Sequence, residues 1–146
     1  MKKKLFLYTL LVLATGCGKS KETPISEQIQ KVWIPNIVKE GTTTVYTRGA
    51  TSNIRAAYQY FKLDLSTAGK VTLTTVDQNS FTGTWALSSD NTTLTLSDLT
   101  PEPTGTSGTI VYTVTGTPSS TQLHLTSTTA DLKTGNTIND YQLIPQ

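Results

Sequence analysis

The sequence predicts an all-β fold: a small antiparallel up-and-down β-barrel of eight or nine strands with a short N-terminal helix. Three observations support this prediction. Apolar and polar residues alternate strictly over several consecutive segments, turn-forming clusters separate these segments, and threonine is abundant throughout. Strict alternation is typical of half-buried antiparallel strands, and β-branched residues suit a pleated surface. Short connections favour a meander of neighbouring strands over a Greek-key sandwich, which needs long crossovers.

The chain enters the domain through a short helix predicted over residues 24–30, with Thr23 as its cap and Pro24 at its first position. A strand is expected directly after it. Pro35 lies within that strand and has no N–H to donate to a neighbour. It therefore predicts an edge or a bulge at this point of the sheet.

The most regular alternation lies between residues 57 and 96, where four consecutive strands are expected. Within it, Phe81 and Trp85 are expected to face the barrel interior, and Gly83 between them leaves room for a bend or a close neighbour. The expected strands of the whole chain cover residues 31–39, 42–47, 57–65, 70–77, 81–87, 92–96, 109–115, 121–126 and 139–144.

Loop lengths differ between the two ends of the expected barrel, because successive connections of a strict meander alternate between its ends. One end is expected to carry the short connections 40–43, 66–69, 88–91 and 116–120. The other is expected to carry the long connections 48–56, 98–108 and 130–138, together with the short turn 77–80. Long exposed loops often carry binding sites, so the second end is the expected mouth. The helix is expected to arrive at this same end, where it would compete with the mouth for space.

The length and charge of the chain limit the classes of function. With 146 residues, the chain is expected to form one domain after an N-terminal targeting segment. It carries 12 Lys and Arg against 10 Asp and Glu, but three of the basic residues are Lys2, Lys3 and Lys4. Without them nine basic residues remain, and the net charge falls slightly below zero. This balance gives no electrostatic basis for binding nucleic acid.

The first 17 residues have the order of parts found in a secretory signal. Three lysines precede an apolar run at 5–14, which small residues separate from Cys17. The run is about ten residues long, short of the ~20 that a transmembrane helix needs, so cleavage is preferred to membrane insertion. Cys17 is the only cysteine, which excludes an internal disulfide.

The segment Ala14-Thr-Gly-Cys17 resembles a bacterial lipobox, with Leu13 one step before the place where leucine is usual. The resemblance implies a signal peptide over 1–16, cleavage before Cys17, and diacylglycerol with palmitate-like acyl chains on that cysteine. It also implies a lipidated tether over 17–23 and a lipoprotein held on the bilayer of the cell envelope. Gly18 occupies the position where an aspartate commonly causes retention in the inner membrane. The expected location is therefore the outer membrane. The alternative is an ordinary signal with a chance cysteine.

The remaining residues, 24–146, resemble the bacterial lipocalin-like lipoprotein domains. The resemblance rests on Lys31-Val-Trp33 after a short helix and on Phe81-Thr-Gly-Thr-Trp85 inside the meander. It implies a small barrel that holds an apolar ligand.

Two sets of residues are the candidates for such a site. Aromatic side chains at apolar positions form a candidate ligand lining: Trp33, Phe61, Phe81, Trp85, Tyr112 and Tyr141. The candidate mouth consists of Arg48, Asn53, Arg55 and Lys133, with Asp98, Glu102 and Asn136 beside them. Plain core packing of the aromatic residues is the alternative, because an eight-stranded barrel either fills with side chains or keeps room for one small ligand.

No pattern of catalytic or metal-binding residues stands out in the sequence. His124 is the only histidine, and its alternation with Leu123 and Leu125 predicts that it points outward. A metal site needs three or four ligands in register, and no nucleophile elbow is present. We therefore expect a non-enzymatic monomer without metal or cofactor.

Two hypotheses of function remain open at this stage. The first is a membrane-anchored barrel that binds a small apolar or amphipathic ligand in the cell envelope. The second is a structural or protein-interaction module with a filled barrel, including inhibition of a hydrolase.

Overall fold

The structure is a computed structural model that describes residues 22–146. The predicted signal peptide over 1–16, Cys17 and the tether up to residue 21 lie outside the described residues. Within the described part, no helix is both long enough and apolar enough to cross a bilayer.

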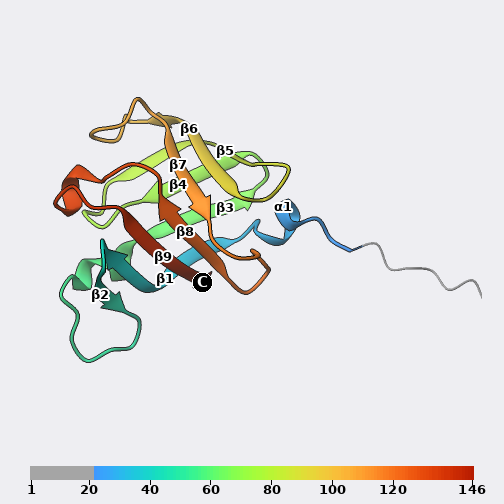
Figure 1. Cartoon of the computed structure of the whole chain (residues 1–146). Helices are drawn as coiled ribbons and strands as arrows, with labels where there is room; N and C mark the ends of the chain where they lie inside the picture. The colour runs from blue at the N-terminus through green and yellow to red at the C-terminus, as the bar shows by residue number, and fades with distance from the viewer. Residues whose placement is uncertain (1–21) are drawn as a thin grey trace, which may run out of the picture.

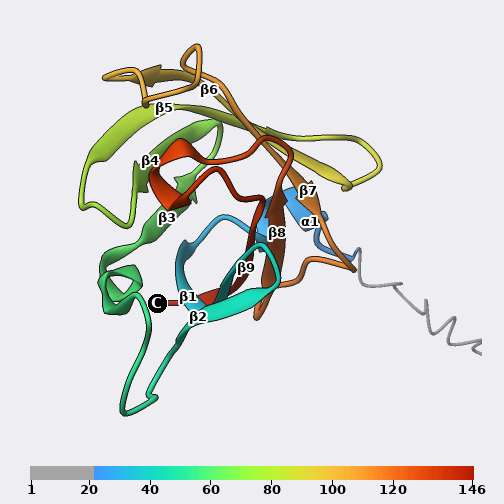
Figure 2. The same ribbon diagram turned by 60° about the vertical axis from the view of Figure 1, so that its left-hand side comes forward.

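The described residues form one antiparallel sheet that closes into a barrel, as the sequence predicts (Figures 1 and 2). Neighbours follow the order β2-β1-β3-β4-β5-β6-β7-β8-β9, and β1 also pairs with β9. The strands are β1 (Val32–Glu40), β2 (Thr43–Thr47), β3 (Lys62–Thr67), β4 (Lys70–Thr74), β5 (Ser80–Leu87), β6 (Thr93–Thr100), β7 (Ile110–Val114), β8 (Leu123–Ser127) and β9 (Asn139–Pro145). The short helices are α1 (Ile25–Gln28), η1 (Ala56–Tyr60) and η2 (Leu132–Thr134). Eight strands close the barrel, and β2 is an additional strand beside β1. This architecture fits a small lipocalin-like barrel.

β1 divides one of its edges between two neighbours. Its first residues pair with β3, where Trp33 lies opposite Leu63, and its last residues pair with β2. Its other edge pairs with β9 along most of its length, with an irregular register between Pro35 and Ile37. The predicted bulge at Pro35 is therefore confirmed, because the proline cannot take part in a regular ladder.

The expected strand over 57–65 is wrong in its first half. Residues 57–60 belong to the 3₁₀-helix η1, and the strand begins only at Lys62. The physical reason lies in the side chains. Tyr58 and Phe61, three residues apart, are buried, which suits the 3.0-residue turn of a 3₁₀-helix, whereas strict alternation starts at Phe61. Two other strands differ slightly from their predicted bounds. β4 ends at Thr74, before the predicted end at 77, and β6 continues to Thr100, beyond the predicted end at 96.

The prediction of which end receives the helix is wrong. α1 lies at the end of the short turns, where the β3–β4, β5–β6 and β7–β8 connections are found (right in Figure 1). The turn at 40–43 lies at the opposite end, where the Gly41 N–H donates to the Ile138 carbonyl (2.9 Å). The reason is that β2 doubles back beside β1 and adds one reversal that a strict meander lacks. Pro24 occupies the N-cap position without a side-chain cap, so the predicted cap by Thr23 is also wrong.

The end that carries α1 is sealed, and we call it the closed end. Ile29, directly after α1, is fully buried, and its carbonyl accepts a hydrogen bond from Trp33 Nε1 (2.8 Å). Trp85 Nε1 donates in the same way to the Thr67 carbonyl at the β3–β4 turn (3.1 Å). Each tryptophan thus places its ring in the core and satisfies its only polar atom on the backbone.

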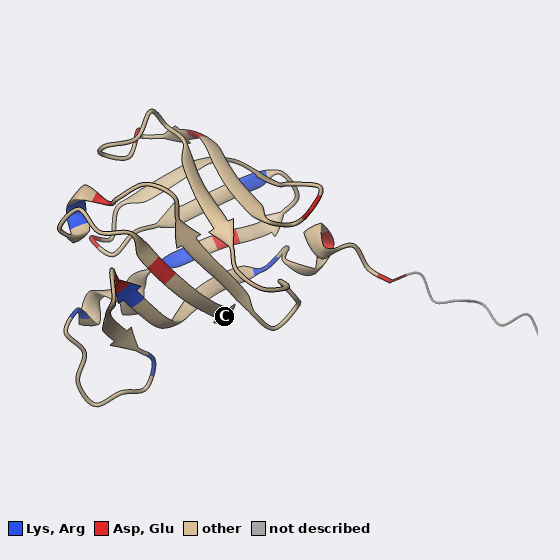
Figure 3. Ribbon diagram, in the orientation of Figure 1, with Lys and Arg blue, Asp and Glu red and all other residues tan. Residues whose placement is uncertain are grey.

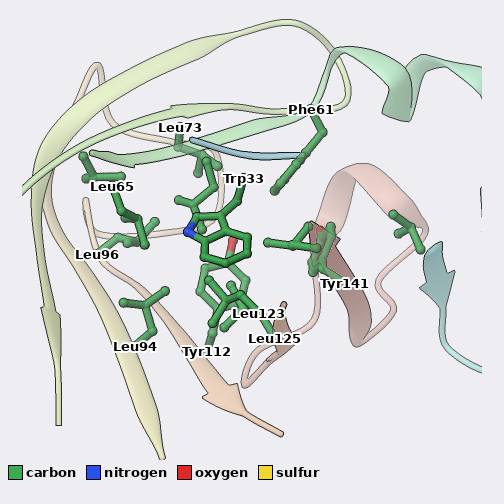
Figure 4. Packing of buried hydrophobic residues seen from close by; sticks show 14 of the residues in the cluster. Trp33, Phe61, Leu65, Leu73, Leu94, Leu96, Tyr112, Leu123, Leu125 and Tyr141 are labelled. Atoms are coloured by element: carbon green, nitrogen blue, oxygen red, sulfur yellow. The ribbon is translucent and has the colours of Figure 1, made fainter. Parts of the chain in front are cut away.

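One continuous core fills the barrel. Figure 4 shows Trp33 in its middle, with Leu65, Leu94 and Leu96 on one side and Phe61 and Tyr141 on the other. The half of the barrel near the closed end is aliphatic apart from the two tryptophans, and the opposite half is rich in phenylalanine and tyrosine.

The predicted register of β5 is confirmed. Phe81 and Trp85 are buried, and Gly83 lies between them against the backbone of β6. A Cβ atom at Gly83 would lie 2.3 Å from the Ser97 carbonyl oxygen, closer than two such atoms can approach. The close neighbour that the sequence predicts at Gly83 is therefore the next strand.

Candidate ligand pocket at the long-loop end

The end opposite α1 is the mouth of the barrel, formed by its long connections. These are the segments 48–61, 101–109 and 128–138, joined by the turns at 41–42 and 75–79. In Figures 1 and 2 they gather on the side away from α1.

A pocket with a volume of about 80 Å³ opens between these loops. Its floor is apolar and comes from four strands of the barrel wall (β4, β5, β7 and β9), from η1 and from the adjoining residues Phe61 and Val76. Its rim is mostly polar and comes from the long loops. The floor residues are Tyr58, Phe61, Leu73, Val76, Phe81, Ile110, Tyr112 and Tyr141, and the polar residues of the rim are Thr75, Thr104, Thr106, Ser127, Thr129, Asp131 and Lys133.

The aromatic rings of the floor pack around Tyr141. The Phe61 ring stacks on it, with centroids 5.0 Å apart and an angle of 20° between the planes. The Tyr112 ring meets it edge-on at 6.1 Å and 88°, and the Tyr58 ring at 6.2 Å and 70°. Edge-on and stacked pairs of this kind are the favoured geometries of aromatic rings. The floor is therefore a rigid surface whose ring faces point in several directions.

Two of the three floor tyrosines have hydroxyl partners in the protein. The Tyr58 hydroxyl donates to Glu40 Oε1 (2.8 Å), and the Tyr141 hydroxyl accepts from Asn139 Nδ2 (3.3 Å). The hydrogen bonds found within residues 22–146 include none to the Tyr112 hydroxyl, although Tyr112 is only 5 % exposed.

Burial is the main reason why the pKa of each floor tyrosine lies above its ordinary value. For Tyr112, the neighbouring Tyr141 and the Asp131 carboxylate raise the pKa further. For Tyr58, Tyr141 and the hydrogen bond to Glu40 add to the effect of burial. The Asn139 hydrogen bond opposes the rise at Tyr141 without reversing it. All three hydroxyls therefore stay neutral at physiological pH.

A buried asparagine holds the loop that carries η2 against the barrel. Asn139 is fully buried, and its Oδ1 accepts hydrogen bonds from Thr137 Oγ1 (2.8 Å) and Thr134 Oγ1 (3.2 Å). Its backbone N–H donates to Ser127 Oγ (2.9 Å). Together with the hydrogen bond from Thr128 to the Val111 carbonyl and that from Gly41 to the Ile138 carbonyl, this network holds the loop that places Asp131 and Lys133 at the rim.

A wider, more open hollow of about 370 Å³ adjoins the pocket. It shares Val76 and Lys133 with the pocket and is otherwise lined by Arg55, Ala57 and Asp77. Its charged side chains are paired. Arg55 Nε lies 2.9 Å from Glu40 Oε1, and Lys133 forms an ion pair with Asp77. Figure 3 shows that both basic and acidic positions, blue and red, occur at the end of the barrel opposite α1.

Of the six aromatic residues predicted to line a ligand site, all are buried but only four reach the pocket. Phe61, Phe81, Tyr112 and Tyr141 line it. The two tryptophans lie toward the closed end, where they pack in the core.

The residues predicted at the mouth divide in a similar way. Lys133 lines both the pocket and the hollow, and Arg55 lines the hollow. Arg48 and Asn53 instead hold β2 in place: Arg48 Nε donates to the Pro35 carbonyl (2.7 Å), and Asn53 Oδ1 accepts from the Thr47 N–H (2.7 Å).

The three remaining residues predicted beside the mouth lie on its loops or on β6 outside the pocket lining. Asp98 and Asn136 have positive φ angles of 54° and 61° and shape the backbone, while Glu102 is exposed.

Sequence reasoning missed Tyr58, Asp131 and Asp77 as members of the site. Tyr58 was assigned to a strand, and a single tyrosine in that stretch carries no distinguishing signal. Asp131 and Asp77 lie in turns more than 50 residues apart, and only the closed barrel brings them near Lys133.

His124 lies on the outer surface of the barrel, as predicted. Its Nε2 is 2.6 Å from Asp140 Oδ2, so the ring links β8 to β9. Within the described residues, no three His, Cys, Asp or Glu side chains converge to hold a metal ion.

Residues 22–146 thus form a closed eight-stranded antiparallel barrel with a packed core and a small pocket at its mouth. Comparison with known proteins gives no matching family model, no similar curated protein and no similar solved structure.

Proposed function

We propose that this protein is a non-enzymatic lipoprotein of the cell envelope, anchored through acylated Cys17, that binds the end group of a small apolar or amphipathic molecule at its mouth. The observation that carries the proposal is the pocket itself, with an aromatic floor and a hydroxyl-rich rim. Pockets of this composition, apolar with a few convergent polar groups, are the usual sites of small-molecule binding.

The volume of the pocket limits how such a ligand is bound. Sites for whole drug-sized ligands measure roughly 300–1,000 Å³, whereas this pocket offers about 80 Å³. Only an end group of a few heavy atoms fits inside. The adjoining hollow of about 370 Å³, with its charged walls, would take the polar remainder of an amphipathic ligand.

The place where the chain enters the barrel supports a mouth that faces away from the bilayer. Pro24 precedes α1 at the closed end, and it lies seven residues after Cys17 in the sequence, with residues 18–23 between them. Seven residues span at most about 25 Å when fully extended. An anchor at Cys17 therefore favours a barrel whose closed end lies near the lipid and whose mouth is open to the surrounding compartment.

Extraction of the purified full chain, followed by mass spectrometry, tests ligand binding. We expect a co-purifying amphipathic molecule that is lost in Ala130→Leu, because Ala130 lines the pocket at its exposed rim and a larger side chain there would obstruct the opening. Ala86→Leu on the outer face of β5 is the matched control and should retain the molecule. A molecule retained equally by both variants, or absent from the wild type, would contradict the proposal.

Metabolic labelling tests the anchor. Labelled palmitate should be incorporated into the wild-type chain and lost in Cys17→Ser. Incorporation that survives this substitution would show that Cys17 is not the acylated residue.

A second candidate function, a protein-interaction module, is favoured by a separate observation. The large hydrophobic side chains exposed in the described residues all lie on two adjacent segments of the mouth: Ile54 (77 %), Tyr60 (51 %), Leu132 (59 %) and Ile138 (42 %). Arg55 Nη1 joins these segments by donating to the Lys133 carbonyl (3.4 Å). Crosslinking in intact cells tests this function: Ile54→Ser with Leu132→Ser should abolish a crosslinked partner protein that the wild type retains.

A further inference from the structure

The floor of the mouth pocket has the composition of an aromatic cage. Phe81, Tyr112 and Tyr141 come from β5, β7 and β9, and Phe61 lies between η1 and β3; together with Tyr58 they surround the same small volume. The near-perpendicular rings of Tyr112 and Tyr141 and the stacked ring of Phe61 present π-faces and edges in different directions. Cages of this kind bind alkylated ammonium groups, because the negative faces of several rings attract one cation.

The charges around the pocket leave one acid without a basic partner. The charged residues that line it are Asp131 and Lys133. Lys133 is paired with Asp77, and Arg55 in the adjoining hollow is paired with Glu40. Asp131 forms no ion pair within residues 22–146; its Oδ1 accepts only the Lys133 backbone N–H (2.8 Å). Counted over the pocket, the hollow and their ion pairs, the residues Asp131, Asp77, Glu40, Lys133 and Arg55 carry a net charge of −1.

The effect of Asp131 reaches the floor of the cage. Burial and the neighbouring Tyr141 are the larger causes of the raised pKa of Tyr112, and the Asp131 carboxylate adds to them. Burial is also the main cause of the raised pKa of Tyr141, to which Asp131 again contributes. The Asp131 carboxylate raises both pKa values, as expected where the electrostatic potential is negative. Such a potential favours a bound cation and disfavours a further negative charge.

The protein already places one of its own cations against this cage. Lys133 Nζ lies 6.0 Å from the centre of the Phe81 ring, at the outer limit of a cation–π contact. The ammonium remains at the rim, where it also contacts Asp77, and leaves the interior of the pocket free.

The size of the pocket and the free hydroxyl of Tyr112 restrict the ligand further. A cavity of ~150 Å³ holds benzene, so one of about 80 Å³ holds a group of roughly half that size. One methyl-bearing side of an alkylated ammonium is of this size, and the rest of such a group lies at the open rim. Where the nitrogen keeps a proton, the Tyr112 oxygen offers an acceptor.

We propose that the mouth pocket binds a small alkylated ammonium group, enclosed by the rings of Phe61, Phe81, Tyr112 and Tyr141 and balanced by Asp131. This inference rests on the proposed function, for which it names the class of end group. The same chemistry occurs in free ammonium compounds such as choline and in choline-bearing lipid headgroups.

Titration of the purified full chain, followed by NMR chemical shifts, tests the proposal. The probes are choline and its neutral isostere 3,3-dimethylbutan-1-ol, which has the same shape without the charge. We expect choline to bind about fivefold more tightly or better, as a cation–π contact in a partly desolvated site would provide. Equal or tighter binding of the neutral isostere, or no binding of choline, would overturn the proposal.

Three variants locate the effect. Asp131→Asn should weaken choline binding by about fivefold and leave the neutral isostere unchanged, whereas Glu27→Gln, a matched loss of one acid at the closed end, should change neither. Lys133→Gln should strengthen choline binding, because it removes a like charge from the rim. An unchanged choline affinity in Asp131→Asn would overturn the role of that carboxylate.

Two further outcomes separate this inference from the proposed function and identify the source of the group. Tighter binding of monomeric dihexanoylphosphatidylcholine than of choline would assign the group to a lipid headgroup, and the reverse to a free amine; either supports the proposal. If an uncharged molecule co-purifies with the chain and is lost in Ala130→Leu, the ammonium proposal fails and the proposed function stands.

Discussion

The two ends of the barrel are built from the same alternating strands but are filled differently. Near the closed end, leucine and valine surround two tryptophans, each of which satisfies its indole N–H on a backbone carbonyl. At the mouth, tyrosine and phenylalanine line a small pocket, and the hydroxyl of Tyr112 is left free. Complete packing therefore stabilises the closed end. The mouth instead keeps a pocket and an acid, Asp131, that forms no ion pair within residues 22–146, and neither feature improves the packing of the core.

Truncation of a tryptophan should separate the two ends most clearly. Trp85→Ala is expected to lower the free energy of unfolding by about 3–5 kcal/mol, because it removes a large buried ring and its hydrogen bond. Equilibrium urea unfolding measures the loss. Tyr112→Phe at the mouth is the control and should change the stability by less than about 0.5 kcal/mol, since its hydroxyl has no partner to lose. A loss below about 1 kcal/mol for Trp85→Ala would mean that the ring is not part of the packed core.

A methyl group added at Gly83 should have the next largest effect. Gly83→Ala places a Cβ atom 2.3 Å from the Ser97 carbonyl oxygen, so β5 and β6 must separate locally. We expect a loss of about 3 kcal/mol, at the upper end of the usual cost of overpacking. Thr82→Ala on the exposed face of the same strand should cost less than about 0.5 kcal/mol. Similar losses in the two variants would contradict the close approach of the strands.

Loss of the buried asparagine should loosen the mouth without opening the closed end. Asn139→Ala leaves Thr134 and Thr137 without their shared acceptor and is expected to cost about 1–2 kcal/mol. Hydrogen exchange should accelerate over 131–138 and remain slow around Trp33. Asn79→Ala, an exposed asparagine on a turn at the same end, provides the comparison and should leave exchange unchanged. Equal acceleration at both ends would show that the two halves unfold as one unit.

The smallest expected effect concerns the pKa values of two aspartates, which lie in turns at opposite ends of the barrel. Burial alone would raise the pKa of Asp77 at the mouth, but its hydrogen bonds to Lys133 and Thr75 outweigh this and hold it below its usual range. Hydrogen bonds from Ser88 and Thr92 lower the pKa of Asp90 at the closed end. A lowered pKa in the folded state stabilises the fold above the unfolded value of about 3.9, and this contribution is lost as pH falls through the folded pKa.

Carboxyl NMR titration of the wild type and Lys133→Gln measures this difference. The pKa of Asp77 should rise in the variant, because it loses both a hydrogen bond and an opposite charge, while that of Asp90 should stay the same. A parallel shift of both would contradict a local origin.

Most of the strands, and the buried face of each, follow from the alternation of apolar and polar residues along the chain. Alternation of side chains is a property of the extended backbone, so Phe81 and Trp85 could be placed in the interior and Gly83 against a neighbour without knowledge of the fold. Pro35 marked its bulge for an equally local reason, the missing N–H. The lipid anchor at Cys17 stays a prediction of the sequence alone.

The tertiary structure decided which end is sealed and where the pocket lies. Residues 57–60 form a 3₁₀-helix because Tyr58 donates a hydrogen bond to Glu40 and packs edge-on against the ring of Tyr141. Both partners lie far from Tyr58 in the sequence. β1 shares one edge between β3 and β2, which reverses the predicted assignment of α1 and moves it opposite the long loops. Pairing around a closed barrel depends on contacts between distant strands, and no local pattern of residues encodes these.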